Sequence, residues 1–465
     1  MRNRSWVSLA VMLSISTVSA ATNSNEVKLQ RWQGQMVLPD KQELPFALEL
    51  FDHGGYLTAN AQSPAQGVDV LPVSDLQITE LGMRFSLPVL GAQVQTEKAE
   101  NGCLRGTLHQ GIDLPLHICP DGAFEPFRLT DGKHGSNELV KFAGQQSGIF
   151  LAGTLSKPKG VKKPPVIVIA QGSGPSDRDG QVGPHRPYQA LAEQLVEQGF
   201  AVLRFDKRGV RQSNGDYASS TAETFASDLS AAFAFLAQRD DINIERIGVA
   251  GHSEGSHVAA IAASRSGFDF VISLSGVGLD GIDAIVLQDG TETLAKGASV
   301  EQAKRLQQIA ERYYRILLDA PDDTARTTQL KQYLAGLNAD DKAIYQQWGA
   351  PSYTLNLQNA EADGLYSILA SQPAKDWSKV TVPVLLLNGD KDVQVPANEN
   401  LQALAATLKA AGNSKVRVEL MANLNHMFQT TENGSTEEYA QLTESFSPRA
   451  TKIIVQWYQQ QFGNK

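Results

Sequence analysis

The sequence predicts a mostly parallel, doubly wound α/β domain that carries a helical insertion and follows a small antiparallel β domain. Between residues 22 and 138, short runs of alternating apolar and polar residues are separated by turn residues, which is typical of antiparallel sheets and small barrels. From residue 139 to 465, strand-like and helix-like segments alternate, and this predicts a parallel sheet with helices on both faces. Residues 278 to 379 interrupt the alternation with a long helical stretch, the predicted insertion.

The composition of the 465-residue chain is that of an ordinary globular protein, with 42% hydrophobic and 20% charged residues. The chain contains 41 Lys and Arg residues against 50 Asp and Glu residues, which gives a formal net charge of -9, and it has no block of basic residues. Proteins that bind nucleic acids usually present clustered basic charge. We therefore expect no nucleic-acid partner.

Residues 1 to 20 are predicted to be a signal peptide rather than part of the fold. Arg2 and Arg4 supply a positive start, residues 6 to 18 are uncharged and largely apolar, and the sequence VSA at 18 to 20 offers small residues for cleavage. A membrane anchor is the alternative, but the uncharged stretch is shorter than the roughly 20 residues that a span requires. We expect an exported protein, periplasmic or secreted, whose mature part has no stable membrane span.

The predicted strands of the β domain include the runs FALEL, LTANA, LQITE and MRFSLPV. Each run alternates apolar with polar residues, as a half-buried strand does. Pairs such as Asn101-Gly102 and Asp121-Gly122 mark turns between strands. The region therefore has the pattern of a meandering antiparallel sheet or a small barrel.

The two cysteines of the chain, Cys103 and Cys119, lie in this β domain on two short predicted strands. Cross-strand neighbours satisfy disulfide geometry, and an exported protein meets oxidising conditions. We predict one structural disulfide, with two free buried thiols as the alternative. Because the cysteines are so few and no histidine cluster has metal-ligand spacing, we expect no metal site.

The second domain follows a predicted linker at residues 128 to 147. Its first strand, GIFLAGTLSKP, alternates in polarity, and the next, PPVIVIA, is a continuous β-branched run of the kind found in buried parallel strands. The later predicted strands are AVLRFD, IERIGVAGH, FDFVISLSG, VPVLLLNG and VRVELM. The predicted helices are PYQALAEQLVEQG, TAETFASDLSAAFAFLAQ, a helix from about Glu254, residues 396 to 411 and IIVQWYQQQF.

The insertion at 278 to 379 contains a helix with an apolar stripe. Its members are Val300, Ala303, Leu306, Ile309, Tyr313 and Ile316. Such a stripe usually packs into a core. A long insertion between two sheet strands also allows a second interpretation, a lid over the ends of the strands.

The motif G-x-S-x-G, here residues 251 to 255, marks a candidate nucleophile, Ser253. A predicted strand precedes the motif and a predicted helix follows it. On a tight strand-to-helix turn the serine hydroxyl projects above the edge of the sheet, and the two glycines permit close backbone contacts. The surrounding pattern therefore strengthens a motif that would be weak alone.

A serine hydroxyl is a weak nucleophile until a base removes its proton. Of the eight histidines, His426 is the best candidate because it follows the last predicted sheet strand, where functional groups collect in open α/β sheets. The base needs a carboxylate partner, and Asp390 and Asp392 both follow a buried strand. The chain order Ser253, Asp392, His426 is the order expected for this scaffold, so we favour Asp392, with Asp390 as the rival.

From about residue 148 to its end, the chain resembles the α/β-hydrolase fold serine hydrolases. The resemblance lies in VIVIAQGSGPSDRDG, RFDKRGVRQSNG, GVAGHSEGS, LLLNGDKDVQVP and NHMF. It implies the α/β-hydrolase fold, and it places the acid at the end of the segment GxxD, here Asp392. It also implies an oxyanion hole made by the backbone N–H groups of Ser173 and Glu254, with Gln171 where the family usually has His.

The segment GSGPSDRDG, together with the N-terminal β domain, closely resembles a bacterial subgroup of secreted esterases and serine-peptidase-like hydrolases. The Asp-Arg-Asp cluster at 177 to 179 could recognise a polar substrate end, but such a cluster more often ties a loop down by charge-assisted hydrogen bonds, and we favour that structural role. We also expect structural roles for Asp206, Arg208 and Ser213.

These observations predict a serine hydrolase that cleaves carboxylic esters of short or medium acyl chains through Ser253, His426 and Asp392, without a cofactor or metal. A serine peptidase acting on short peptides, of aminopeptidase or acylaminoacyl-peptidase type, is the alternative, and a thioesterase is third. A non-catalytic binding protein is least favoured because the set of three residues is complete. The expected partner is a small ester or a short peptide.

Overall fold

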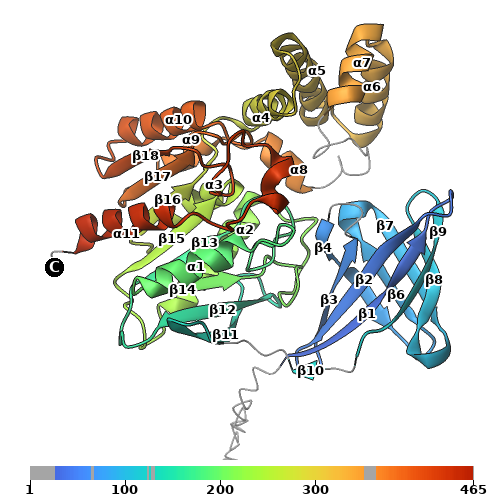
Figure 1. Cartoon of the computed structure of the whole chain (residues 1–465), viewed down its shortest axis with the longest axis horizontal. Helices are drawn as coiled ribbons and strands as arrows, with labels where there is room; N and C mark the ends of the chain where they lie inside the picture. Colours follow the sequence, from blue (N-terminus) through green and yellow to red (C-terminus); the bar gives the residue numbers. More distant parts are fainter. Residues whose placement is uncertain (1–26, 64–67, 123–124, 127–130, 350–362, 464–465) are drawn as a thin grey trace, which may run out of the picture.

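The computed structural model describes residues 27–63, 68–122, 125–126, 131–349 and 363–463, which form an antiparallel β domain beside a larger α/β domain (Figure 1). The predicted signal peptide, residues 1 to 20, lies outside the described residues. The ten strands of the β domain are β1 (Lys28–Val37), β2 (Glu43–Asp52), β3 (Leu57–Ser63), β4 (Val68–Pro72), β5 (Ser74–Ile78), β6 (Met83–Leu87), β7 (Ala92–Lys98), β8 (Leu104–His109), β9 (Asp113–Pro120) and β10 (Glu125–Pro126).

The β domain is an up-and-down barrel with one open seam. The strands pair in the order β4-β3-β2-β1-β9-β8-β7-β6-β5, so most consecutive strands pair with each other and β9 pairs back onto β1. Among β1 to β9, the consecutive pair that is not hydrogen-bonded is β4 with β5, which meet at the corner residue Val73. The sheet predicted from the alternating runs is therefore present and is curled almost into a closed ring.

The barrel is held together by the alternation that the sequence displays. On β7, Ala92, Val94 and Thr96 are buried while Gln93 and Gln95 face solvent. The inward side chains of the other strands fill one apolar core, whose largest members include Trp32, Met36, Phe46, Leu48 and Phe85. Burial of such side chains contributes about 2 kcal/mol each and is the main driving force for the barrel.

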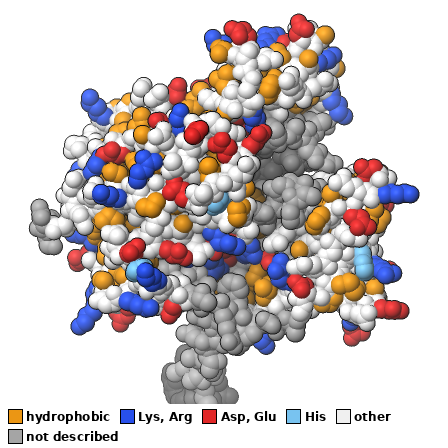
Figure 2. Space-filling view, in the orientation of Figure 1, with side chains coloured by type: hydrophobic (Ala, Val, Ile, Leu, Met, Phe, Trp, Pro, Cys, Tyr) orange, Lys and Arg blue, Asp and Glu red, His pale blue; other side chains and the backbone are white. Residues whose placement is uncertain are grey.

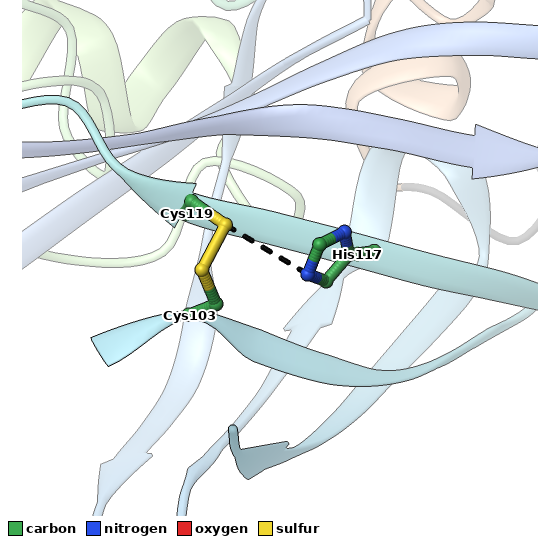
Figure 3. Close-up of a disulfide and its surroundings, with 3 residues drawn as sticks. All are labelled: Cys103, His117 and Cys119. Carbon is green, nitrogen blue, oxygen red and sulfur yellow. Dashed lines mark hydrogen bonds between the residues drawn. A yellow bond between two sulfur atoms is a disulfide. The ribbon is translucent and has the colours of Figure 1, made fainter. Parts of the chain in front are cut away.

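Cys103 and Cys119 form a disulfide that joins the residue before β8 to β9 (Figure 3). The predicted disulfide is thus confirmed, and the alternative of two free thiols is wrong. His117 lies beside the bridge, with its Nε2 atom 3.7 Å from the Cys119 sulfur. Since both sulfurs are bonded to each other, they are not thiolate ligands for a metal.

The α/β domain contains one eight-stranded sheet. Its strands are β11 (Gly135–Ala143), β12 (Phe150–Pro158), β13 (Val166–Ala170), β14 (Ala201–Phe205), β15 (Ile247–His252), β16 (Phe270–Leu274), β17 (Val384–Gly389) and β18 (Val416–Met421). They pair in the order β11-β12-β14-β13-β15-β16-β17-β18, and β12 alone among them runs against the others. This is the predicted, mostly parallel sheet.

Strand β11 corrects two predictions about the boundary between the domains. We expected the β domain to extend to residue 138 and residues 128 to 147 to be a linker, but β11 pairs with β12 along its whole length and belongs to the α/β sheet. Its sequence, GSNELVKFA, is polar because it is an edge strand that contributes only Val140 and Phe142 to the core of the sheet. The α/β domain therefore begins at or before Gly135.

Helices cover both faces of this sheet. They are α1 (Pro187–Glu197), α2 (Ala222–Leu236), α3 (Glu254–Ala263), α10 (Ala397–Ala410) and α11 (Pro448–Phe462). Side chains of α1 and α11 share one core with one face of the sheet, and side chains of α2, α3 and α10 share a second core with the other face. The doubly wound arrangement agrees with the continuous apolar runs of the central strands.

Between β16 and β17 the described residues include α4 (Gly281–Ala295), α5 (Val300–Asp319), α6 (Asp323–Gly336), α7 (Ala339–Trp348), α8 (Asp363–Leu369) and α9 (Pro373–Trp377). The predicted apolar stripe of α5 is buried at Ala303, Leu306, Ile309, Tyr313 and Ile316, but Val300 at its start is 52% exposed. In Figure 1, α5, α6 and α7 stand away from the sheet, whereas α4 and α8 lie close to it. Whether the insertion moves as a lid stays a prediction.

The surface carries both signs of charge. On the face shown in Figure 2, acidic and basic side chains intermingle over both domains. None of the helices in the described part of the chain is both long enough and apolar enough to cross a membrane.

Candidate active site

Ser253 stands on a strained turn between β15 and α3. Its backbone has φ 55° and ψ -125°, a conformation that is rare for a residue with a side chain and that typifies a nucleophile at a strand-to-helix turn. Both motif glycines are required by close packing. A Cβ atom at Gly251 would collide with the carbonyl oxygen of Gly255, and one at Gly255 would collide with that of Ala170.

His426 and Asp392 come from two loops that follow neighbouring strands, β18 and β17. The Nδ1 atom of His426 lies 2.9 Å from Oδ2 of Asp392, and both side chains are almost fully buried. The other oxygen of Asp392 accepts hydrogen bonds from the backbone N–H groups of Gln394 and Val395, at 3.0 and 2.8 Å. This carboxylate is therefore held from one side while it orients the imidazole from the other.

Asp390, the rival acid, lies elsewhere. It is exposed, and its Oδ1 atom accepts a hydrogen bond of 2.6 Å from the backbone N–H of Asn423. It thus closes the turn between the ends of β17 and β18. Of the two carboxylates, Asp392 is the one that the structure brings to His426.

Two cavities meet at Ser253. The one that we name the inner cavity has a volume of about 60 Å³, lies beneath α4 and α8, and is lined by Ser173, Glu254 and apolar residues of the insertion such as Ile285 and Ile368. The one that we name the outer cavity has a volume of about 380 Å³ and is lined by His426, Ser173, residues of the loop 172–182, and Val70 from strand β4 of the barrel. Ser253 and Ser173 line both cavities, so the structure gathers the predicted site residues at one place.

The loop that carries Ser173 follows β13 and packs tightly against the Ser253 turn. A Cβ atom at Gly172 would lie 3.2 Å from Cβ of Ser253. The Gln171 side chain, which stands where the family usually has His, donates a hydrogen bond to the carbonyl oxygen of Phe205 and so fastens the loop to the end of β14. The substitution of His by Gln therefore leaves this loop anchored.

Lys207 is a buried cation that the sequence analysis did not identify. Its ammonium group donates a hydrogen bond of 2.6 Å to the carbonyl oxygen of Gly172 and lies 3.7 Å from a carboxylate oxygen of Glu254. It also lies 4.5 Å from the centre of the Phe225 ring. Burial lowers the pKa of Lys207, and the Glu254 carboxylate opposes that shift. Lys207 thus contacts Gly172, the residue before the candidate donor Ser173, and Glu254, which is the other candidate donor.

We expect Lys207→Met to lower kcat about 10- to 100-fold, because loss of the ammonium group frees the carbonyl of Gly172 and with it the N–H of Ser173. Ester turnover at saturating substrate measures the effect. Lys157→Met is the control, since Lys157 pairs with Glu138 and Asp241 at a distance from the site. Equal losses in both variants would contradict a specific role for Lys207.

A second buried chain of hydrogen bonds supports the site from behind. The backbone N–H of Gly172 donates to the Tyr188 hydroxyl, which lies 3.0 Å from Nδ1 of His252, and Nε2 of His252 lies 2.9 Å from the carbonyl oxygen of His426. A neutral His252 with its proton on Nε2 satisfies every partner. These hydrogen bonds link the Ser173 loop to the backbone of His426. Nothing in the sequence indicated that Tyr188 on α1 takes part in them.

The buried state of His252 predicts a pH dependence of stability. Desolvation, followed by its proximity to His426, lowers the pKa of His252 from 6.5 to about 3. Between these values the unfolded chain binds a proton that the folded chain does not, so this contribution to stability is present above pH 6.5 and is lost as the pH falls. Below pH 6.5, we expect the free energy of unfolding to fall less steeply with decreasing pH in His252→Gln than in the wild-type protein. The difference in slope should be up to about 1.4 kcal/mol per pH unit.

Urea unfolding of both proteins across this pH range measures that difference in slope. His134→Gln is the control, because the His134 side chain is 42% exposed. Parallel curves for the wild-type chain and His252→Gln would show that His252 is not held neutral.

The charged loop at 177 to 179 is tied down as predicted. The Arg178 guanidinium makes two hydrogen bonds to the Asp206 carboxylate, at 3.0 and 2.6 Å, and Oδ1 of Asp177 accepts hydrogen bonds from three backbone N–H groups, those of residues 179 to 181. Arg208 pairs with the buried Asp228, and the Ser213 hydroxyl donates to the backbone carbonyl of Asp206. Both charged segments are thus held by the hydrogen bonds that a structural role requires. Asp177 also lines the outer cavity, and its role toward a substrate stays a prediction.

Comparisons with known proteins identify a family and several relatives. Residues 147–426 match the family model described as X-Pro dipeptidyl-peptidase (S15 family). Esterase EstD of Thermotoga maritima is 25% identical over 307 residues, which cover 66% of this chain and 65% of that esterase, so the chain spans slightly less than two thirds of that relative's length. A non-heme haloperoxidase of Rhodococcus erythropolis is 24% identical over 240 residues, or 50% of this chain and 77% of that protein.

Among solved structures, the Pyrococcus furiosus esterase Pf2001 is 17% identical, with a TM-score of 0.43 and coverage of 70% of this chain and 91% of that one. Est1E from Butyrivibrio proteoclasticus is also 17% identical, with a TM-score of 0.41 and coverage of 70% and 99%. The family match spans more than half of the chain and includes the turn at Ser253, the loop that carries Asp392, and His426 as its last residue. The chain therefore belongs to the X-Pro dipeptidyl-peptidase (S15) family and is an α/β-hydrolase serine hydrolase.

Proposed function

We propose that the protein is a carboxylesterase that cleaves esters of short or medium acyl chains with Ser253 as nucleophile, His426 as base and Asp392 as the orienting acid. The observation that carries this proposal is the hydrogen bond of 2.9 Å between His426 and Asp392 beside a cavity that Ser253 and Ser173 also line. The similarity to Esterase EstD supports the ester class of substrate.

The proposed reaction proceeds through an acyl-enzyme. His426 accepts the Ser253 proton as the serine oxygen attacks the carbonyl carbon, and the N–H groups of Ser173 and Glu254 stabilise the oxyanion, each by roughly 3 kcal/mol. His426 then gives the proton to the departing alcohol. Water attacks the acyl-enzyme by the same sequence, which releases the acid and restores the serine.

The lining of the inner cavity favours an uncharged acyl group. The cavity is small and is lined by apolar residues such as Ile285 and Ile368 together with neutral polar residues such as Gln288. The carboxylate that lines it, Glu254, is already paired with the ammonium group of Lys207. A free peptide amino terminus would be held best by an unpaired carboxylate, and Glu254 is the carboxylate among the described lining residues. The larger outer cavity, which His426 lines, suits the leaving alcohol.

A serine peptidase is the second candidate, and the family match is the observation that favours it. The same nucleophile, base and oxyanion donors cleave amides in other serine hydrolases. The two candidates differ in whether the site can hold and protonate an amine leaving group, which the triad alone does not decide.

The test is a paired panel of substrates. The purified protein would be given p-nitrophenyl esters of increasing acyl length together with aminoacyl and dipeptidyl anilides, and a fluorophosphonate probe would report which residue is modified. We expect ester turnover that declines as the acyl chain outgrows the inner cavity, no comparable anilide turnover, and modification of the peptide that contains Ser253. Anilide turnover of similar efficiency would move the assignment to peptidase.

Residues 1 to 20 also support a proposal about where the protein is located. We infer that the protein is exported, because Arg2 and Arg4 precede an uncharged stretch and small residues at 18 to 20. The disulfide in the barrel supports an oxidising compartment. Amino-terminal sequencing of the protein recovered from the periplasm or the medium would test this inference, and an uncleaved chain in the cytosol would contradict it.

A further inference from the structure

We propose that the N-terminal barrel takes part in catalysis, because Glu49 of the barrel holds Arg211, and Arg211 holds Asp177 in the loop that carries Ser173. The inference rests on the proposed function of the site. It assigns Glu49, Arg211 and Asp177 as positioning residues, which act through the N–H group of Ser173 rather than by touching the substrate.

The barrel end of this link is a buried carboxylate. Glu49 lies on β2, is 5% exposed, and accepts a hydrogen bond of 2.5 Å from the Arg211 guanidinium in the α/β domain. Arg31 on the neighbouring strand β1 approaches the same carboxylate at 3.4 Å. A buried charge costs several kcal/mol unless it is paired, so Glu49 is held between two arginines, and the hydrogen-bonded one is Arg211.

The barrel also holds the backbone of Arg211. Arg211 has a φ of 46°, a left-handed conformation that costs about 1 kcal/mol for a residue with a side chain. Its carbonyl oxygen accepts a hydrogen bond of 2.5 Å from the Thr58 hydroxyl on β3. Two strands of the barrel therefore form hydrogen bonds with Arg211 of the α/β domain, one to its side chain and one to its backbone.

The other end of the link is the loop beside the nucleophile. The Nε atom of Arg211 lies 3.3 Å from Oδ2 of Asp177, an ion pair without hydrogen-bond geometry. The Oδ1 atom of Asp177 accepts the three backbone hydrogen bonds that shape residues 179 to 181. Asp177 is four residues from Ser173, and Gly174 between them has a φ of 89°, where a Cβ atom would meet no neighbour within 4 Å. Ser173 thus lies between two anchors, Lys207 at Gly172 and Arg211 at Asp177.

The barrel is close enough to the reacting atoms for this link to matter. Val70 of β4 lines the outer cavity together with Ser173, Ser253 and His426. A shift of an oxyanion donor by about 1 Å costs roughly 100-fold in rate, and much smaller shifts are still measurable. Loosening the Asp177 anchor should therefore weaken binding of the transition state while leaving ester binding in the ground state nearly unchanged.

The test uses the full-length protein and the variant Glu49→Gln, which keeps the shape of the side chain and removes its charge. We expect kcat for p-nitrophenyl esters to fall about tenfold, with KM within about twofold of the wild-type value. The inhibition constant of a trifluoromethyl ketone, which forms an oxyanion when serine adds to it, should rise by the same factor as kcat falls. Tyr56→Ala is the matched control, because the Tyr56 ring packs edge-on against Phe150 across the same domain interface.

A double-mutant cycle separates positioning from general stability. Asp177→Asn should cause a similar loss of kcat, and the double variant should lose no more than the larger single loss, since both changes break one link. Additive losses, or an unchanged kcat in folded Glu49→Gln, would overturn the inference. If Glu49→Gln does not fold, Asp177→Asn decides alone, and an unchanged kcat in that variant overturns it.

The outcomes also distinguish this inference from the proposed function. If the wild-type chain has no turnover that depends on Ser253, the proposed function fails and the inference fails with it. If the wild-type chain has such turnover and Glu49→Gln matches it in kcat and in ketone affinity, the inference alone fails.

Discussion

Replacing Ser253 by alanine is expected to lower kcat for ester hydrolysis by about 10⁶-fold, the loss that removal of the serine nucleophile causes in well-studied serine hydrolases. The reason is that no acyl-enzyme can form, so that only the oxyanion donors and His426 remain to assist direct attack by water. The fold should survive, because alanine keeps a side chain no larger than that of serine on a turn whose glycines already provide the close contacts. The variant should also resist a fluorophosphonate probe.

Turnover at saturating ester, measured with active-site titration of the wild-type protein, gives the size of this effect. Ser264→Ala, at the far end of α3, is the matched control and should keep full activity. Residual turnover above about one per cent in a titrated Ser253→Ala sample would remove the serine from its assigned role.

Replacing Asp392 by asparagine is expected to lower kcat about 10⁴-fold. The asparagine side chain has nearly the same shape, but its amide would favour the wrong tautomer of His426 and would no longer stabilise the imidazolium that forms during attack. The effect should appear in kcat with little change in KM, because Asp392 is behind His426 and away from the ester.

The neighbouring carboxylate supplies the control for this change. Asp390→Asn removes a charge two residues away, at an exposed turn where the side chain accepts one backbone hydrogen bond. We expect its kcat to stay within about twofold of the wild-type value. Loss of activity in Asp390→Asn with retention in Asp392→Asn would reverse the choice between the two acids.

Much of this arrangement could be predicted from the sequence because the patterns that indicate its strands and turns are local. The continuous apolar runs at β13 and β17 indicate buried parallel strands, and the glycines around Ser253 indicate a turn that only they permit. The order of Ser253, Asp392 and His426 follows from the order of the strands that present them. Each of the three residues is marked by residues close to it in the chain, and the family resemblance joins the three segments.

The rest depends on residues that meet only in the folded chain. Strand β11 reads as a polar linker because an edge strand buries few of its side chains. Lys207 is one lysine among many until the fold places it between Gly172 and Glu254. The pair Glu49 and Arg211 joins residues far apart in sequence and in different domains, and nothing in the sequence indicates that they meet.

The closure of the barrel has a consequence for the order in which the chain folds. Strand β1 begins at Lys28 and pairs with β9, which ends at Pro120, so the ring cannot close until its last strand is available. Pairing between such distant segments is slow, because the entropy of the intervening chain must be lost first. In chain order, however, this whole segment comes long before His426, so it is available first when the chain emerges from its amino-terminal end. The barrel would then be folded first, and the α/β domain would complete its folding in contact with it.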